Sequence, residues 1–341
     1  MFFLMMLPMA APIGNTTLKA AQVMVESVPV ASPTFNAAQR CFIDPVWSAS
    51  DIQITRDIPY GSNYNNLTGK VQTLLLDIYQ PPDSDNRTMR PGFVLVHGGS
   101  FMTGDKSSDG EPLYAVKLAQ RGFVVVSIDY RLTGQSTQHL SVSTRPEEDA
   151  TEDARAAIRA MRAHADQFRV DSDRIAISGD SAGAITSLWL GYVKGRAQQN
   201  GTSGNPGYSS DVRLAAPISG TMKFQAFCKY IHPAPSDCAV NAVNDYTGDV
   251  DGKPHPDGSP QPALLMVHGT EDYTLPFVNA QAVAAAAAAA GIPSKLIAIQ
   301  GAGHVPFTQL YEGGRFDEFM AFVVEAMDLS HAQCPHAYKR Q

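Results

Sequence analysis

One pentapeptide, Gly-Asp-Ser-Ala-Gly at residues 179–183, constrains the fold of this chain more than any other feature. It directly follows a short apolar run, 174–178, and directly precedes an apolar helical pattern, 182–193. Glycines two positions on either side of Ser181 allow a sharp strand-to-helix turn, because backbone and helix can then approach closely. Such a turn holds the serine hydroxyl exposed at the positive end of a helix. We therefore predict that Ser181 is a nucleophile at the edge of a sheet.

The rest of the chain alternates between strand-like and helix-like patterns. Short apolar runs without polar alternation are typical of parallel strands buried on both faces, and helical patterns of ordinary length separate them. The first two strands are joined by a turn rich in Gly and Asn and should form an antiparallel hairpin. We predict an α/β fold: a mostly parallel sheet of about eight strands, opened by this hairpin, with helices on both faces. The predicted strands are 52–58, 71–79, 93–96, 123–128, 175–178, 214–219, 264–267 and 295–299, and the helices are 112–120, 147–168, 182–193, 277–290 and 316–327.

The same pattern predicts one catalytic domain over residues 51–330, since no linker of shifted composition divides it. Residues 1–50 are irregular and rich in Pro, Ala and Ser, and we interpret them as a leader followed by an N-terminal wrap. Residues 331–341 form a tail. Within the domain, residues 221–261 have no clear period and many Gly, Pro and Asp residues, which predicts a long lid-like loop.

The overall charge argues against two classes of partner. The chain has 26 basic and 33 acidic residues, a formal charge of −7, and no basic run beyond Lys339 and Arg340. A nucleic-acid-binding protein normally carries a clustered basic surface. No stretch approaches the roughly 18 apolar residues of a membrane span. We expect neither a nucleic acid partner nor a membrane span, and the oligomeric state stays open.

The compartment is suggested by three weak signals. Residues 1–11, or slightly more, form a candidate signal peptide with an apolar run, although no Lys or Arg precedes that run. Four cysteines permit two disulfides, and four Asn-x-Ser/Thr sequons are more than chance predicts. Together they favour a secreted glycoprotein, with a cytoplasmic protein as the alternative. The sequons are at Asn15, Asn66, Asn86 and Asn200.

Of the three pairings that four cysteines allow, we predict Cys228–Cys238 and Cys41–Cys334. The first closes a short loop within the lid-like segment, and the second ties the N-terminal wrap to the tail. Each pairing joins segments without regular structure of their own, where a cross-link restricts the chain most. The alternative is four free thiols in a cytoplasmic protein.

A second motif follows the predicted strand 93–96. It is His-Gly-Gly-Ser-Phe at residues 97–101. Paired glycines after a buried strand let backbone N–H groups turn inward with no side chain in the way. Such donors suit the oxyanion that forms when a serine attacks a carbonyl. We predict that this loop contributes to an oxyanion hole.

A serine nucleophile also needs a base and an acid that orients the base. His304 lies in a loop directly after the last predicted strand, and Asp272 lies just past the strand before it. Active sites of open α/β sheets gather at such strand ends. We predict the order Ser181, Asp272, His304, with Glu271 as the less favoured acid. His97 and His268 also end strands, and we expect them to be hydrogen-bonded structural residues.

These motifs together resemble the α/β-hydrolases, specifically the esterase branch with hormone-sensitive-lipase-like carboxylesterases and the smaller feruloyl and acetyl esterases. The resemblance covers roughly residues 50–328 and implies that the backbone N–H groups of Gly99, Ser100 and Ala182 form the oxyanion hole. Two departures leave the substrate open: Ser100 replaces the usual third glycine, and Thr133 follows the Asp-Tyr-Arg-Leu motif. The resembling segments are 97–99, 129–132, 179–183, 268–272 and 303–304.

We therefore expect a cofactor-free serine hydrolase that acts on small-molecule carboxylic esters with short or aromatic acyl groups. Amidase, formamidase or peptidase activity, and a non-catalytic binding protein on the same scaffold, are the alternatives. Phe101, Phe224 and Phe227 are candidate substrate-binding residues. A metal site is not expected, because no Cys-x-x-Cys spacing accompanies the cysteines. Asp129 and Arg131 are expected to form a buried pair that supports the site.

Overall fold

The computed structural model describes residues 40–108, 110–133, 146–194, 201–223 and 245–334. The chain divides into two units after Thr34, and all of these residues belong to the second, Phe35–Gln341.

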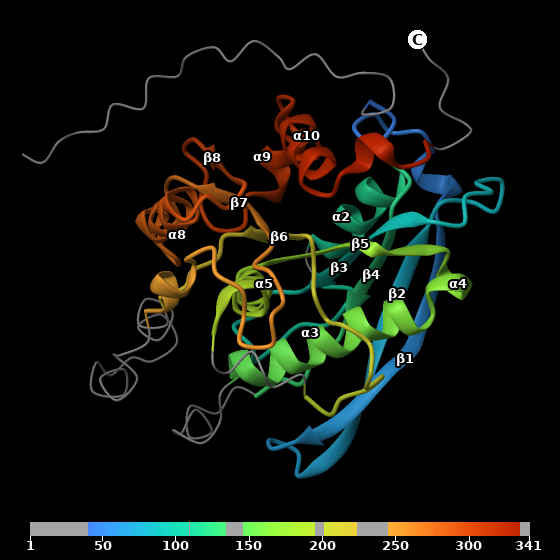
Figure 1. Cartoon of the computed structure of the whole chain (residues 1–341), viewed down its shortest axis with the longest axis horizontal. Helices are drawn as coiled ribbons and strands as arrows, with labels where there is room; N and C mark the ends of the chain where they lie inside the picture. The colour runs from blue at the N-terminus through green and yellow to red at the C-terminus, as the bar shows by residue number, and fades with distance from the viewer. Residues whose placement is uncertain (1–39, 109, 134–145, 195–200, 224–244, 335–341) are drawn as a thin grey trace, which may run out of the picture. The chain divides into compact units, whose positions relative to one another are not determined.

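An eight-stranded sheet organises the unit, in the order β1-β2-β4-β3-β5-β6-β7-β8 (Figure 1). The pairs β1–β2 and β2–β4 are antiparallel, and the other five neighbouring pairs are parallel. The predicted fold class is confirmed, and every predicted strand lies within or largely within one of these. The strands are β1 (Gln53–Asn65), β2 (Lys70–Gln80), β3 (Arg90–Val96), β4 (Val124–Ile128), β5 (Val170–Asp180), β6 (Leu214–Ile218), β7 (Ala263–Gly269) and β8 (Ser294–Ile299).

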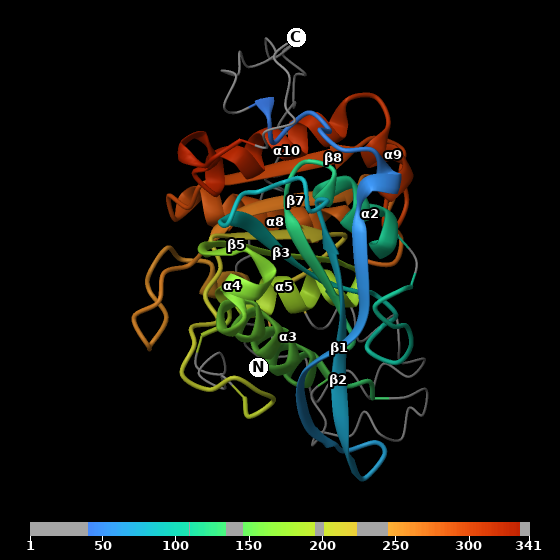
Figure 2. The ribbon, with the colours of Figure 1, turned by 90° about the vertical axis from the view of Figure 1, so that its right-hand side faces the viewer.

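Helices cover both faces of the sheet, because alternate residues of each central strand point to opposite sides. Val94 and Val96 join a core with α3, α5 and α8, whereas Phe93 and Leu95 join a second core with α2 and α10. Figures 1 and 2 show these two helix layers on either side of the strands. The helices are α2 (Glu111–Ala119), α3 (Pro146–Ala163), α4 (Ala165–Phe168), α5 (Ala182–Tyr192), α8 (Phe277–Ala289), α9 (Phe307–Tyr311) and α10 (Arg315–Ala326), with 3-10 turns η1 (Ala49–Asp51), η3 (Tyr246–Asp249) and η4 (Leu329–His331).

The first hairpin and the longest predicted helix differ from the sequence prediction. The hairpin β1–β2 is longer than its apolar residues suggest, and it pairs as far as Asn65 and Lys70 (Figure 2). Most of the added side chains are exposed or half-buried, so backbone pairing is the main contact there, with Tyr60 buried in the first core. The predicted helix 147–168 is divided at His164, whose φ of −112° and ψ of 25° are not helical. The turn lets Phe168 bury its ring at the end of α4.

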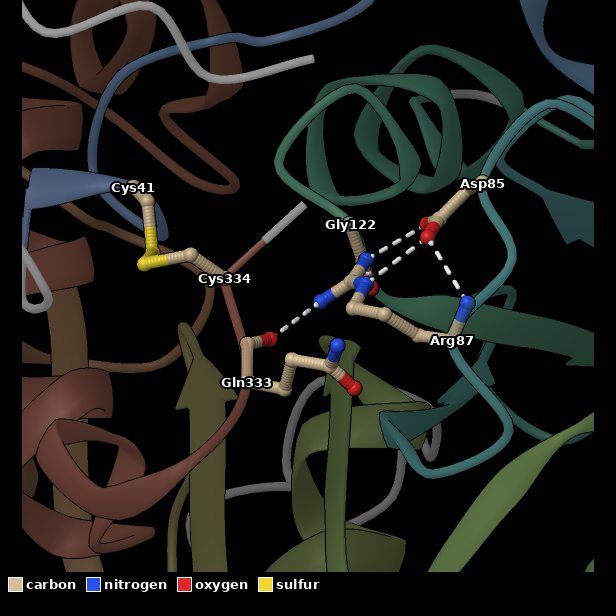
Figure 3. Close-up of a disulfide and its surroundings, with 6 residues drawn as sticks. All are labelled: Cys41, Asp85, Arg87, Gly122, Gln333 and Cys334. Carbon is tan, nitrogen blue, oxygen red and sulfur yellow. Dashed lines mark hydrogen bonds and ion pairs between the residues drawn. A yellow bond between two sulfur atoms is a disulfide. The ribbon is translucent and has the colours of Figure 1, made fainter. Parts of the chain in front are cut away.

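The N- and C-terminal ends of the described chain are joined by the disulfide Cys41–Cys334, which confirms that predicted pairing (Figure 3). The fully buried Arg87 lies beside it and donates to the carbonyl oxygens of Gln333 and Gly122. Asp85 neutralises Arg87 through two further bonds, of 2.9 and 2.6 Å. The predicted pair Cys228–Cys238 lies outside the described residues.

The lid-like loop is described only at its two ends, 221–223 and 245–261. There Lys223 and Asp245 form an isolated β-bridge. Tyr246 packs edge-on against Trp189 with ring centroids 4.9 Å apart, so this aromatic residue contacts the core. Among the described helices, none combines the length and apolar character needed to cross a membrane.

Candidate active site

The turn between β5 and α5 places Ser181 in a conformation that few residues adopt. Its φ is 49° and its ψ is −111°, and its N–H donates to the carbonyl oxygen of Ile218. The two flanking glycines are required by close packing: a Cβ on either Gly179 or Gly183 would overlap the carbonyl oxygen of Val96. The turn therefore rests directly on the end of β3, and Ser181 stays partly exposed.

The three residues predicted as nucleophile, base and acid lie in one hydrogen-bonded chain. His304 Nε2 is 2.9 Å from Ser181 Oγ, and His304 Nδ1 is 2.7 Å from Asp272 Oδ2. They come from loops after β5, β8 and β7. Glu271 is exposed, and only its backbone N–H contacts the His304 loop, through the carbonyl oxygen of Ala302. The geometry therefore selects Asp272 over Glu271 as the partner of His304.

Asp272 is surrounded by hydrogen-bond donors. The backbone N–H groups of Thr274 and Leu275 donate to Oδ1, at 2.9 and 2.8 Å. His268 Nε2 lies 3.2 Å from Oδ2 and 2.7 Å from the carbonyl oxygen of Leu275. Burial alone would raise the pKa of Asp272, but the hydrogen bonds from His268, His304 and Leu275 outweigh it and hold the pKa well below its ordinary value.

An ionised Asp272 only accepts hydrogen bonds, so His304 Nδ1 must donate to it. The Nε2 atom of a neutral His304 then accepts the hydroxyl proton of Ser181. This is the tautomer that a general base acting on Ser181 requires. His268 is fully buried and its Nε2 is bonded to the Leu275 carbonyl oxygen, as expected for a structural residue.

The loop after β3 approaches the Ser181 turn closely. The N–H of Gly98 donates to Asp180 Oδ1 at 3.1 Å, and a Cβ on Gly98 would overlap this carboxylate. Gly99, Ser100 and Phe101 follow with φ values of 97°, 56° and 61°, three successive left-handed residues. In the described part of the chain, the N–H groups of Gly99, Ser100 and Ala182 donate to no protein acceptor. They are therefore available as donors.

Two residues after β4 support this loop, and the sequence analysis gave neither a role there. Tyr130 donates from its hydroxyl to the carbonyl oxygens of His97 and Gly98, at 3.1 Å each, and its ring stacks on His97. Thr133 donates from its N–H and its hydroxyl to the carbonyl oxygen of Phe101. Burial lowers the pKa of His97, and this effect exceeds the opposite effect of the hydrogen bond between His97 and the Gly98 carbonyl oxygen. A lowered pKa favours the neutral imidazole, as expected for a structural residue.

The expected pair of Asp129 and Arg131 is wrong. The two side chains enter different clusters of charged residues, and each has its partners on another part of the chain. Asp129 accepts from the Lys106 N–H and lies 3.8 Å from the Lys106 ammonium group. Arg131 instead pairs with three carboxylates near the start of α3, at 2.9 Å each: Asp149, Glu152 and Asp153.

The candidate substrate-binding residues are not brought to the site as a group. Phe101 is fully buried and packs edge-on against Tyr130, so its ring supports the loop after β3 from the protein interior. Phe224 and Phe227 lie outside the described residues. Within the described ranges, no group of three or more His, Cys, Asp or Glu side chains could hold a metal ion.

Comparison with known proteins gives one family match and several distant relatives. The family model BD-FAE matches residues 76–254, just over half of the chain. The probable carboxylic ester hydrolase LipM of Mycobacterium tuberculosis is 28% identical over 216 residues, covering 60% of this chain and 47% of that protein. The probable isoprenylcysteine alpha-carbonyl methylesterase ICMEL2 of Arabidopsis thaliana is 25% identical, covering 80% of this chain and 62% of that protein. The chain thus spans less than two thirds of the length of these relatives.

Solved structures share the fold over a larger part of the chain. Thermogutta terrifontis esterase 2 with butyrate bound superposes with a TM-score of 0.60 at 20% identity, covering 86% of this chain and 98% of that one. The same esterase phosphoramylated by tabun gives a TM-score of 0.59 at 21% identity, with 85% and 98% coverage. At this identity the likeness establishes a common fold.

Proposed function

Because this chain belongs to the BD-FAE family of α/β-hydrolases, we propose that it hydrolyses carboxylic esters through Ser181, His304 and Asp272. The observation that carries this proposal is the continuous hydrogen-bonded chain from Asp272 through His304 to the Ser181 hydroxyl. The names of the curated relatives, a carboxylic ester hydrolase and a methylesterase, point to the same reaction class.

In the proposed mechanism, His304 Nε2 removes the hydroxyl proton as Ser181 Oγ attacks the ester carbonyl carbon. The carbonyl oxygen becomes an oxyanion, which accepts hydrogen bonds from the N–H groups of Gly99, Ser100 and Ala182. The carbon–oxygen bond to the alcohol then breaks, and His304 returns the proton to the departing alkoxide. Water, deprotonated by His304, attacks the acyl-enzyme and releases the acid, which restores Ser181.

The geometry of the site favours this mechanism over a non-catalytic binding role. Asp272, held ionised, stabilises the imidazolium that forms at each proton transfer. Ala182 is the first residue of α5, so its N–H points out of a helix N-terminus, where developing negative charge is favoured. A binding protein would need neither the strained φ of Ser181 nor an imidazole nitrogen of His304 directed at its hydroxyl.

Covalent labelling with a fluorophosphonate probe tests the proposal. We expect stoichiometric labelling of the wild-type chain and hydrolysis of p-nitrophenyl acetate, and the loss of both in Ser181→Ala, whose small side chain still fits the turn. Circular dichroism and the thermal midpoint should match those of the wild type. A folded wild-type chain that neither labels nor hydrolyses any ester of the panel below would refute the proposal.

For the substrate we propose short acyl or single-ring aromatic acyl groups. Ser100 places a side chain where a third glycine would leave space beside the acyl group, and its left-handed backbone fixes the direction of its Cβ. Specificity constants for acetate, butyrate, decanoate, palmitate and ferulate esters test this, with matched anilides to compare ester and amide cleavage. A kcat/KM that rises toward palmitate, with activation above the micellar concentration, would contradict it.

We also propose that the chain is secreted and glycosylated. The disulfide Cys41–Cys334 favours an oxidising compartment, and the sequon residues Asn66 and Asn86 are both exposed. Expression in a eukaryotic cell followed by endoglycosidase treatment tests this. A secreted product should lose mass on treatment, and Asn66→Gln or Asn86→Gln should remove one glycan each. A product retained in the cytoplasm with reduced thiols would contradict it.

A further inference from the structure

In the candidate site, the nucleophile Ser181 and the base His304 come from strands that are not neighbours in the sheet. His304 follows β8 and Ser181 follows β5, and β6 and β7 lie between these strands. Neighbouring strands are about 4.8 Å apart, so the His304 loop must turn back across two strands to reach the nucleophile. Hydrogen bonds near β7 hold the start of this loop: Gly301 N–H donates to Thr270 Oγ1, and Glu271 N–H donates to the carbonyl oxygen of Ala302.

The far side of the loop is held at the end of β6. The hydroxyl oxygen of Ser219 accepts the N–H of Val305, the residue after His304, at 3.0 Å. Ser219 is itself fixed, because its N–H donates to the carbonyl oxygen of Val267 on β7. The preceding residue, Ile218, accepts the N–H of Ser181. Two consecutive residues of one strand end therefore hold the nucleophile on one side and the base on the other.

We propose that Ser219 is a positioning residue that sets His304 between Ser181 and Asp272. This role rests on the proposed serine hydrolase function and deepens it. Ser219 is fully buried, and its described contact with the His304 loop is the hydrogen bond from the Val305 N–H. Both Ser219 and Val305 have left-handed backbones, with φ of 57° and 54°. That conformation is unfavourable for a β-branched residue such as Val305, so it persists only where surrounding bonds hold it.

The physical basis is the sensitivity of proton transfer to distance. His304 Nε2 must stay within hydrogen-bond reach of Ser181 while Nδ1 stays bonded to Asp272, and both distances depend on the loop backbone. Without the Ser219 hydroxyl, the N–H of Val305 has no acceptor, and the loop can relax toward ordinary backbone angles. A displacement of about 1 Å at a catalytic group costs about 100-fold in rate.

Two substitutions separate this role from simple stability. Ser219→Ala removes the hydroxyl and keeps the strained backbone. Ser219→Gly also removes the hydroxyl, but glycine adopts a φ of 57° without strain, which offsets part of the stability loss. Ser187→Ala is the matched control: Ser187 is equally buried, and its hydroxyl donates only within α5, to the carbonyl oxygen of Gly183.

For each variant we would measure kcat and KM with p-nitrophenyl acetate, the rate constant of fluorophosphonate labelling, and the thermal midpoint. We expect both Ser219 variants to lose about 10- to 100-fold in kcat and a similar factor in labelling, with KM within about twofold of wild type. Ser187→Ala should stay within about twofold in every kinetic constant.

Three outcomes would overturn the proposal. Wild-type kcat in either folded Ser219 variant would show that the hydroxyl does not position the base. If Ser219→Gly had a higher thermal midpoint than Ser219→Ala and its kcat rose in proportion, the loss of kcat would be explained by lost stability alone. A wild-type chain that neither labels nor turns over would overturn the hydrolase function itself, and this role with it.

Discussion

At the scale of single residues, the site depends on the hydrogen bonds that the protein donates to the Asp272 carboxylate. Four donors surround its carboxylate: two backbone N–H groups, His268 and His304. These bonds outweigh the opposing effect of burial and keep the pKa low. Its contribution to stability is therefore present at and above the pKa of an unfolded Asp, and it is lost only as the pH falls toward the lower folded value.

We expect Asp272→Asn to lower kcat by about 10⁴-fold, because an amide leaves His304 in the wrong tautomer while the shape of the site is kept. Steady-state kinetics with p-nitrophenyl acetate measures this. Glu271→Gln is the matched control and should be nearly silent, since the Glu271 side chain is exposed and away from His304. The reverse result would place the acid one residue earlier in the chain.

At the scale of elements, the Ser181 turn depends on contact between β3 and α5. Gly183 lies inside α5, where alanine would ordinarily favour the helix by about 1 kcal/mol. A Cβ at this position would, however, overlap the carbonyl oxygen of Val96 and approach that of His97. The clash is with backbone, which cannot move aside without shifting β3 or the helix. The steric cost therefore exceeds the gain in helix propensity.

Gly183→Ala should accordingly lower the free energy of unfolding by about 1–3 kcal/mol and reduce kcat, because the Ser181 turn and the loop after β3 move apart. Urea unfolding and ester hydrolysis measure the two effects. Gly248→Ala is the control, since a Cβ there meets nothing within 4 Å. It should change stability by no more than about 0.5 kcal/mol. A stabilised and fully active Gly183→Ala would contradict the packing argument.

A second element-scale feature is the attachment of α3 to the segment after β4. One guanidinium group, that of Arg131, serves three carboxylates. Burial raises the pKa of Asp149 to about 6. Repulsion from Asp153 and Glu152 also raises it, and the attraction of Arg131 opposes both effects. A carboxyl group whose pKa is higher in the folded state binds protons more tightly there. Its contribution to stability is thus full below the unfolded pKa of about 4 and falls as the pH rises to about 6.

We therefore expect the stability of the wild type relative to Asp149→Asn to fall by about 2 kcal/mol between pH 4 and pH 6.5. Urea unfolding of both proteins across this range gives the difference directly, and titrating groups that do not interact with Asp149 cancel in it. Asp166→Asn is a control on the neighbouring helix α4. A difference that is flat or rises with pH would contradict the raised pKa of Asp149.

At the scale of the whole molecule, the Cys41–Cys334 disulfide closes a loop with a sequence separation of 293 residues. Cys41, Phe42 and Ile43 are buried against the second core, and Arg87 bonds the carbonyl oxygen of Gln333 next to Cys334. The cross-link therefore joins segments that are already packed together. Closing a loop this long lowers the entropy of the unfolded chain, which corresponds to about 6 kcal/mol in the chain-entropy model.

We expect the double variant Cys41→Ser/Cys334→Ser to lose about 2–5 kcal/mol in the free energy of unfolding. Its kcat below the unfolding transition should be unchanged, since no described hydrogen bond of Ser181, Asp272 or His304 involves these segments. Urea unfolding with and without reductant provides the measurement. Any further loss on reducing the variant would report other disulfides, and an unchanged transition in the variant itself would contradict the prediction.

Much of the fold and of the candidate site could be predicted from the sequence because the deciding interactions are local. The strand–turn–helix around Ser181 and the His-Gly-Gly loop can each be recognised from residues a few positions apart, although their close packing involves distant strands. Likewise, the period of the apolar residues was enough to predict eight strands and a largely parallel sheet.

Interactions between distant segments could be decided only by the tertiary structure. The order of the strands determines that β6 and β7 separate the base from the nucleophile, and hence that Ser219 lies where it meets Val305. Backbone direction at the end of β7 decides that Asp272 faces His304 while Glu271 faces solvent. The partners of Arg131 come from α3, about 20 residues away, whereas Asp129, two residues away in the chain, is bonded to Lys106 instead. Local sequence therefore determined which chemical groups this protein presents, and the packing of segments remote in the chain decided which of them meet.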